Sequence, residues 1–197
     1  DPEGAAYWYE RAAGQGHAGA AGRLGDLYAS GAVGAFQSLG KSAPLIGEAL
    51  RWYRLAAAKG DEEARNTLDG LRARSPLAAA LLARAAGDHA AARAALETLA
   101  RRNDLEAMYW RGTMQENGEG GPADPAGAVP WYEKSYQYGF GPAALALGRL
   151  SEAGKGVPRS IDQAYRMYGA ANRTRSGEAL AALQRLDLTR ELGAPPP

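Results

Sequence analysis

The sequence contains no cysteine, and this absence excludes several kinds of chemistry. Disulfide frameworks, thiolate metal sites and cysteine nucleophiles all need that side chain. Because cysteine-free chains suit oxidising and reducing spaces alike, the compartment stays open. Histidine is almost missing too, since only His17 and His89 occur and neither has a partner at metal-ligand spacing. We therefore expect no metal and no cofactor.

The sequence also lacks an excess of charge of either sign. The 23 basic residues (Lys and Arg) and 22 acidic residues (Asp and Glu) leave a formal net charge of +1. This balance supplies no broad basic field, so we expect no nucleic-acid partner. No segment approaches the roughly 18 apolar residues of a membrane-spanning helix, so we expect no membrane span.

Few residues are β-branched, whereas Ala, Leu and Arg are abundant, and this bias favours helices. A chain of 197 residues is long enough for one domain or one stack of short repeats. Composition alone therefore predicts an all-α fold.

A Trp-Tyr pair recurs at a constant place in a longer pattern. The Trp residues of the pair are Trp8, Trp52 and Trp131, each followed by Tyr. A degenerate copy has Met167 in place of the Trp, again followed by Tyr. In the first copy, apolar residues recur at i, i+3, i+4, i+7 and i+8 from Ala5, which is one stripe of an amphipathic helix. We expect each Trp of the series to be buried in the core rather than to form a ligand platform.

Each copy of the pattern predicts two helices separated by a glycine. Gly16, Gly60 and Gly139 follow the first stripe, where a residue of positive φ can end a helix. Asp1-Pro2, Ser75-Pro76 and Asp124-Pro125 place a capping side chain before a proline, which is typical of a helix start.

Two segments interrupt the regular spacing. The extra residues between Gly31 and Ala49 predict a protruding loop, and the helix-forming run from Pro76 predicts an inserted helix over 76–86. We expect a single solenoid over 1–192, followed by an extended tail at 193–197. Its units are expected at about 1–31, 46–75, 89–118, 124–154 and 160–192.

The first unit carries a family resemblance. From Ala5 to Gly31 it reads Ala-x-x-Trp-Tyr-x-x-Ala-Ala-x-x-Gly-x-x-x-Ala-x-x-x-Leu-Gly-x-Leu-Tyr-x-x-Gly, which resembles the Sel1-like repeat, a relative of the tetratricopeptide repeat. The resemblance implies an α/α solenoid of about 10–11 helices, built from Sel1-like or tetratricopeptide-like hairpins.

The resemblance also implies a function. Sel1-like proteins typically hold multiprotein complexes together, and many bacterial ones are exported to act in envelope assembly, host contact or toxin neutralisation. For this chain the resemblance implies a bacterial scaffold or adaptor that binds a protein partner, in the periplasm or outside the cell rather than in the cytoplasm. Fold likeness is an associational argument for function.

Stacked helical hairpins expose a concave face, where we place the partner-binding side chains. Most of them lie opposite the buried stripe of the first helix of each unit, and Trp110 is added as an aromatic anchor outside the pattern. The set is Tyr7, Glu10, Arg11, Arg51, Arg54, Lys59, Trp110, Glu133, Lys134, Tyr138, Arg166 and Arg173. Its basic, tyrosine-bearing character favours an acidic or carboxylate-bearing protein segment, and the alternative is a solvated face that keeps the repeat soluble.

No catalytic site is visible in the sequence. Ser38 and Lys41 match the S-x-x-K spacing of some acyl-transfer enzymes but lack the companion motifs, and Gly40-Lys41-Ser42 lacks the upstream glycine of a phosphate-binding loop. We therefore expect a protein that is not an enzyme. Two alternatives stay open: an enzyme or small-ligand binder that uses the loop at 36–41, and a rigid spacer between domains absent from this chain.

Overall fold

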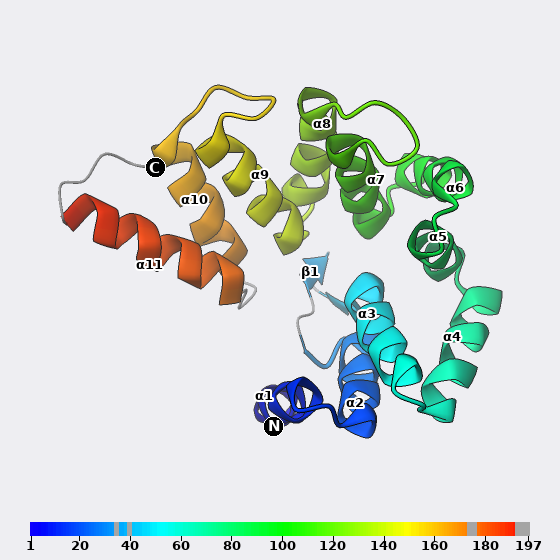
Figure 1. The fold of residues 1–197 in the computed structure, drawn as a ribbon. Helices are drawn as coiled ribbons and strands as arrows, with labels where there is room; N and C mark the ends of the chain where they lie inside the picture. Colours follow the sequence, from blue (N-terminus) through cyan, green and yellow to red (C-terminus); the bar gives the residue numbers. More distant parts are fainter. Residues whose placement is uncertain (34–35, 39–40, 173–176, 192–197) are drawn as a thin grey trace. The chain divides into compact units, whose positions relative to one another are not determined.

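Helices make up nearly all of the described chain (Figure 1). The computed structural model describes residues 1–33, 36–38, 41–172 and 177–191. The helices in these ranges are α1 (Pro2–Gly14), α2 (Ala18–Ala29), α3 (Ile46–Ala58), α4 (Glu62–Arg74), α5 (Pro76–Ala85), α6 (His89–Arg101), α7 (Leu105–Asn117), α8 (Pro125–Gln137), α9 (Gly141–Ala153), α10 (Ile161–Asn172) and α11 (Gly177–Glu191). The all-α prediction is confirmed.

The predicted helix boundaries are present as local hydrogen bonds and backbone angles. Asp1 accepts from the backbone N–H of Glu3 at 3.1 Å, and Ser75 and Asp124 cap α5 and α8 in the same manner. Gly16, Gly60 and Gly139 have φ of 100°, 95° and 99°. A residue with a Cβ would be strained at such a φ. Glycine is not, so these three residues allow the chain to turn sharply between the two helices of a pair.

The predicted protruding loop contains a short hairpin. Strands β1 (Phe36–Ser38) and β2 (Lys41–Ala43) pair antiparallel, with Phe36 opposite Ala43. Residues 34–35 and 39–40 and the side chains of 36–43 lie outside the described residues. The proposed site at 36–41 therefore stays a prediction.

The inserted helix predicted over 76–86 is present as α5, which packs on both α3 and α4. Its apolar face buries Leu77, Leu81 and Leu82. The extra helix therefore adds to the core rather than looping out from it. Across the described ranges, none of the helices combines the length and the apolar character that crossing a membrane requires.

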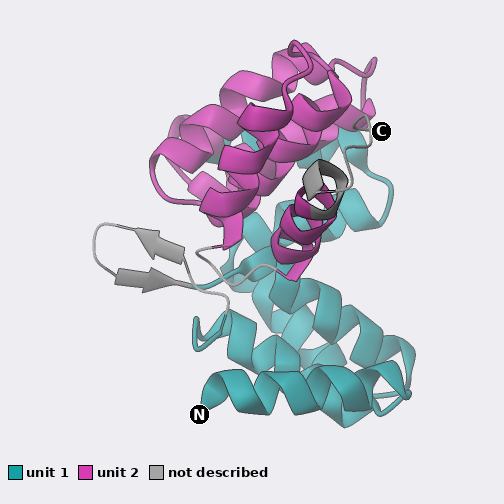
Figure 2. Cartoon of the chain, turned by 90° about the vertical axis from the view of Figure 1, so that its left-hand side faces the viewer, with its two compact units in different colours: residues 1–99 teal, residues 100–197 magenta. Residues whose placement is uncertain are grey.

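The chain divides into two compact units, residues 1–99 and 100–197 (Figure 2). The division falls in the last turn of α6. In the first unit, α2 packs between α1 and α3, and α3 packs on α4 and α5. In the second unit, α7 to α11 pack in sequence order, each helix against the next.

The core of the first unit gathers side chains from α1 to α4. Leu24, Trp52 and Tyr53 are buried there among alanines such as Ala21 and Ala56. These alanines bring the helix backbones close together, so the large aromatic rings fill the remaining space.

The expectation that every Trp of the series is buried is wrong for Trp8. Trp52 is 7% exposed, whereas Trp8 is 63% exposed and Trp131 is only partly buried. Trp52 lies on α3, beside α1. Trp8 lies on α1 itself, and no described helix covers its side of α1, so the repeat position alone does not guarantee burial.

Three tyrosines that follow the repeated Trp or Met position share one arrangement. Each packs its ring on a glycine of the preceding helix and donates its hydroxyl to a carboxylate of that helix. The three sets are Tyr53 with Gly25 and Asp26, Tyr132 with Gly112 and Glu116, and Tyr168 with Gly148 and Glu152. The hydroxyl-to-carboxylate distances are 2.9, 2.6 and 2.6 Å, so this contact locks each helix to the one before it.

We expect these tyrosines to make the fold sensitive to alkali. Burial raises the pKa of Tyr53, Tyr132 and Tyr168 above the ordinary value of 10.0. The unfolded chain therefore loses these protons at lower pH than the folded chain does. Their contribution to the free energy of unfolding should be complete below about pH 10 and should decrease as the pH rises further.

Urea unfolding between about pH 8 and pH 11 measures this dependence, and Tyr168→Phe supplies the comparison because it removes one of the three protons. The decrease above pH 10 should be shallower for Tyr168→Phe by about 1.4 kcal/mol per pH unit. Equal slopes for the two proteins would contradict the assignment.

Candidate functional site

A groove of about 610 Å³ opens between α1 and α3 in the first unit, and we name it the α1–α3 groove. Its walls combine acidic, basic, aromatic and small side chains. The lining residues are Glu10, Ala13 and Gly14 from α1, and Arg51, Trp52, Arg54 and Leu55 from α3. Ala13 and Gly14 on the α1 side are small, so the exposed side chains of Arg51, Arg54 and Leu55 on α3 are accessible beside them.

The two arginines of the α1–α3 groove differ in their partners. Arg51 forms an ion pair with Glu48 at 3.0 Å, and its guanidinium lies 4.5 Å from the centre of the Trp52 ring. Arg54 is exposed and forms no ion pair with any residue that the structure describes. The groove therefore contains one arginine that is held in place and one that is available to an incoming anion.

The apolar part of the α1–α3 groove is unusual in two ways. Leu55 is 36% exposed, although leucine is normally buried in a helical repeat. The indole Nε1 of Trp52 is buried but meets no hydrogen-bond acceptor within the described ranges. An unsatisfied buried donor costs about 1–3 kcal/mol, so an acceptor brought by a ligand would relieve this cost.

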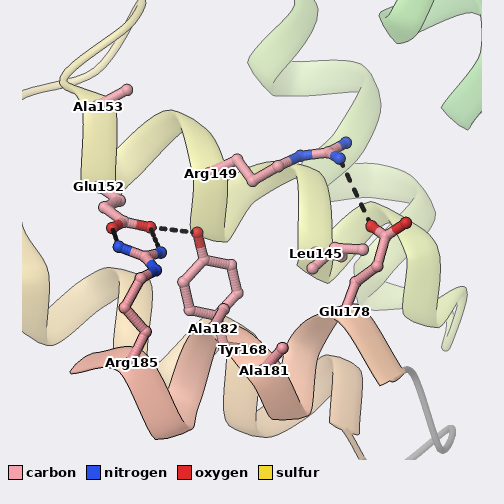
Figure 3. A pocket seen from close by; sticks show the side chains of 9 residues that line it. All are labelled: Leu145, Arg149, Glu152, Ala153, Tyr168, Glu178, Ala181, Ala182 and Arg185. Carbon is pink, nitrogen blue, oxygen red and sulfur yellow. Dashed lines mark hydrogen bonds and ion pairs between the residues drawn. The ribbon is translucent and has the colours of Figure 1, made fainter. Parts of the chain in front are cut away.

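A second concavity, of about 650 Å³, lies in the second unit between α9, α10 and α11 (Figure 3). We name it the α9–α11 pocket. Leu145, Ala181 and Ala182 give it an apolar lining. Two ion pairs border it, Glu152 with Arg185 and the longer Arg149–Glu178 pair at 3.8 Å.

Glu152 is the centre of the polar network in the α9–α11 pocket. It accepts two hydrogen bonds from Arg185, at 2.5 and 2.9 Å, and one from the Tyr168 hydroxyl at 2.6 Å. The Arg185 hydrogen bonds, reinforced by Tyr168, hold the pKa of Glu152 below its ordinary value. These three side chains satisfy one another within the protein, so the network stabilises the packing of α11 rather than forming a ligand site.

The predicted partner-binding residues of the first unit fall into three places. Glu10, Arg51 and Arg54 line the α1–α3 groove together. The other two on α1 contact each other elsewhere on that helix, where Arg11 donates to the Tyr7 hydroxyl at 3.0 Å. Lys59 is exposed at the C-cap of α3.

In the second unit, the predicted residues on α8 and α10 are exposed, and one lies outside the described residues. The exposed ones are Glu133, Lys134, Tyr138 and Arg166, and the one outside the described ranges is Arg173. None of the four lines the α9–α11 pocket. Their role in binding stays a prediction.

Trp110, the proposed aromatic anchor, is half-buried on α7. Its indole N–H donates to Glu106 at 3.2 Å, and its ring meets Tyr109 edge to face at 5.0 Å between centroids. These contacts hold the side chain against its own helix.

Sequence reasoning missed two residues of the α1–α3 groove. Trp52 was expected to serve the core alone, and Leu55 was not singled out. The helical period could have indicated Leu55, because it follows Arg51 by four residues and so shares its side of α3. No sequence pattern signals that the Trp52 indole N–H lacks an acceptor.

Among the described side chains, no group of three or more histidines, aspartates or glutamates lies close enough together to hold a metal ion.

Comparison with protein families finds one match. The Sel1 repeat model matches residues 1–17, 18–61, 105–139 and 141–173. It leaves residues 62–104 unmatched, the part of the chain that contains the inserted helix α5. Curated protein sequences give no significant match.

Solved structures of bacterial proteins resemble the chain. A Sel1 repeat protein from Oxalobacter formigenes is 25% identical with a TM-score of 0.52, over 98% of this chain and 70% of that protein. The cysteine-rich protein B of Helicobacter pylori is 27% identical with a TM-score of 0.44, over 47% of this chain and 69% of that protein.

Proposed function

Because the chain belongs to the Sel1 repeat family, whose members are generally scaffolds for protein–protein interaction, we propose that it binds a partner protein through the α1–α3 groove. The observation that carries this proposal is the gathering of Glu10, Arg51 and Arg54 around one groove with the exposed Leu55. Members of this family are typically not enzymes.

The chemistry of the α1–α3 groove suggests the kind of segment that binds. Arg54 can take a carboxylate of the partner in a bidentate hydrogen bond. The exposed Leu55 can cover an apolar side chain next to it. A backbone carbonyl of the partner can accept from the Trp52 indole N–H once the ring shifts toward it. We propose an extended segment that carries an acidic and an apolar side chain.

This mode of docking would serve either setting implied by the family, an envelope complex or the neutralisation of a toxin. Both need a rigid surface that holds one segment of another protein. The guanidinium of Arg54 is exposed, so salt screens its attraction to the partner's carboxylate, and the affinity for the partner should fall as the salt concentration rises.

The proposal can be tested with a phage-displayed peptide library selected on the chain of residues 1–197. The enriched peptides should combine an acidic and an apolar side chain. Arg54→Glu should raise the dissociation constant of an enriched peptide by about tenfold or more, because it replaces attraction by repulsion. Isothermal titration calorimetry with the synthetic peptide measures the change.

The matched control is Arg74→Glu, which makes the same change of charge in the same unit but away from the α1–α3 groove. The dissociation constant of the peptide from this variant should stay close to that measured with the unchanged chain. Enriched peptides without acidic residues, or equal binding to both variants, would count against the proposal.

A further inference from the structure

The exposed side of α1 carries an aromatic and cationic cluster formed by Tyr7, Trp8 and Arg11. Tyr7 and Trp8 are 54% and 63% exposed, and their rings meet edge to face at 5.4 Å. The Arg11 guanidinium lies 5.8 Å from the centre of the Tyr7 ring and 5.7 Å from that of Trp8. These mutual contacts hold the cluster in one arrangement, so little conformational freedom remains to be lost on binding.

The repeat itself shows how a Trp at this position is normally covered. Trp52 occupies the same repeat position on α3, belongs to the same core cluster as Ala13 of α1, and is only 7% exposed. A neighbouring helix therefore covers the ring in that copy. Trp8 lacks such a helix within the described residues, and Trp, Tyr and Arg are the residues most enriched at binding hot spots.

We propose that the helix covering this cluster is α1 of a second copy of the chain, packed antiparallel. Glu3, Tyr7 and Arg11 follow one another at i, i+4 and i+8, so they form one stripe along α1. A two-fold axis at Tyr7 places Glu3 of each copy opposite Arg11 of the other. The stripe is thus complementary to itself in charge, as an interface between two identical chains requires.

The geometry of α1 supports this pairing. Glu3 lies in the first turn of α1 and Arg11 in the last, so the two charges are equally distant from Tyr7. Antiparallel pairing also sets the positive end of each helix dipole beside the negative end of the other. Each Trp8 then lies on the same side of the pair as Trp8 of the second copy, close to the axis, whereas Ala6 faces the core of its own chain.

One pair of helices buries less surface than the roughly 1,600 Å² of a standard interface, so the dimer should be weak, with a dissociation constant in the micromolar range. Sedimentation velocity of the chain of residues 1–197, from low to high micromolar concentration, tests this. Trp8→Ala should raise the dissociation constant by about thirtyfold or more. A chain that stays monomeric over the whole range would overturn the proposal and leave the cluster for a different protein.

Tyr138→Ala is the matched control, because Tyr138 is 53% exposed but belongs to the other unit. It should leave the dissociation constant unchanged. If it weakens dimerisation as much as Trp8→Ala does, the interface is not α1. Because both side chains are exposed, circular dichroism should show that both variants keep their helices.

A mixing experiment tests the register. Glu3→Arg alone and Arg11→Glu alone each place like charges opposite one another at both ends of the pair, so each variant by itself should be monomeric. Mixed together, the two variants restore an attractive pair at both ends and should form a dimer. Absence of the mixed dimer, with both variants folded, would overturn the antiparallel register. Peptide binding in the α1–α3 groove should be unchanged by Trp8→Ala, which separates this proposal from the previous one.

Discussion

Replacing Gly148 by alanine is expected to lower the free energy of unfolding by about 2–3 kcal/mol, although alanine is the better helix former. A Cβ at this position would lie 2.5 Å from the Tyr168 ring, a distance that real structures do not show. Tyr168 is buried, and its hydroxyl is bound to Glu152, so the ring cannot move away without breaking that hydrogen bond. Urea unfolding measures the change.

Gly169→Ala is the matched control on α10. A Cβ added there meets no atom within 4 Å, and the residue also lies inside a helix. This substitution should raise the free energy of unfolding by about 0.5–1 kcal/mol, because alanine loses less backbone freedom on folding. If both substitutions stabilise the chain, the close approach of α9 and α10 is not rigid.

Glu152→Ala is expected to cost about 3 kcal/mol of the free energy of unfolding. The change removes the acceptor of the hydrogen bonds from Tyr168 and Arg185 and leaves the Tyr168 hydroxyl without that partner. Figure 3 shows that Arg185 reaches Glu152 from α11, so that helix should lose the most protection. Hydrogen exchange of the α11 amides, together with urea unfolding, measures both effects.

The effect of Glu152→Ala should depend on pH. The pKa of Glu152 lies below its ordinary value of 4.5, so its stabilising contribution is complete above that pH and is lost as the pH falls further. The difference between the two proteins should therefore shrink in acid.

Glu178→Ala is the control for this prediction. Glu178 borders the same pocket and faces Arg149 at 3.8 Å, but its side chain is 75% exposed. The substitution should change the free energy of unfolding by less than about 1 kcal/mol, because exposed ion pairs contribute little. Equal costs for the two glutamates would show that burial does not decide the strength of these pairs.

The candidate site could be predicted only in part from the sequence. The helical period placed Glu10, Arg51 and Arg54 away from the buried stripe, and all three do line one groove. The same reasoning could not show that Tyr7 and Arg11 lie outside that groove, although their i, i+4 spacing places them on one face of α1. Spacing along one helix indicates which side chains share a face, but not which faces of two helices meet.

Trp8 shows that the sequence pattern is also insufficient to predict which repeated residues are buried in the core. Its sequence surroundings match those of Trp52, yet one ring is exposed and the other is buried. Burial of a repeated residue depends on whether another helix packs over it, and that is a property of the neighbour rather than of the repeat. The α9–α11 pocket had no sequence signal either, because Glu152 and Arg185 are distant in the chain.

The sequence by itself determined the elements of this protein: the helices, their caps at Asp1, Ser75 and Asp124, and the left-handed glycines that end them. These features depend on residues within a turn or two of one another, so a local pattern is sufficient to specify them. Only the tertiary structure decided which surfaces are hollow, which Trp is covered and which arginine is available. Those properties arise where distant segments meet. The physical reason is that water is excluded and charged groups are paired where two helices pack together, and a pattern within one helix does not specify its neighbour.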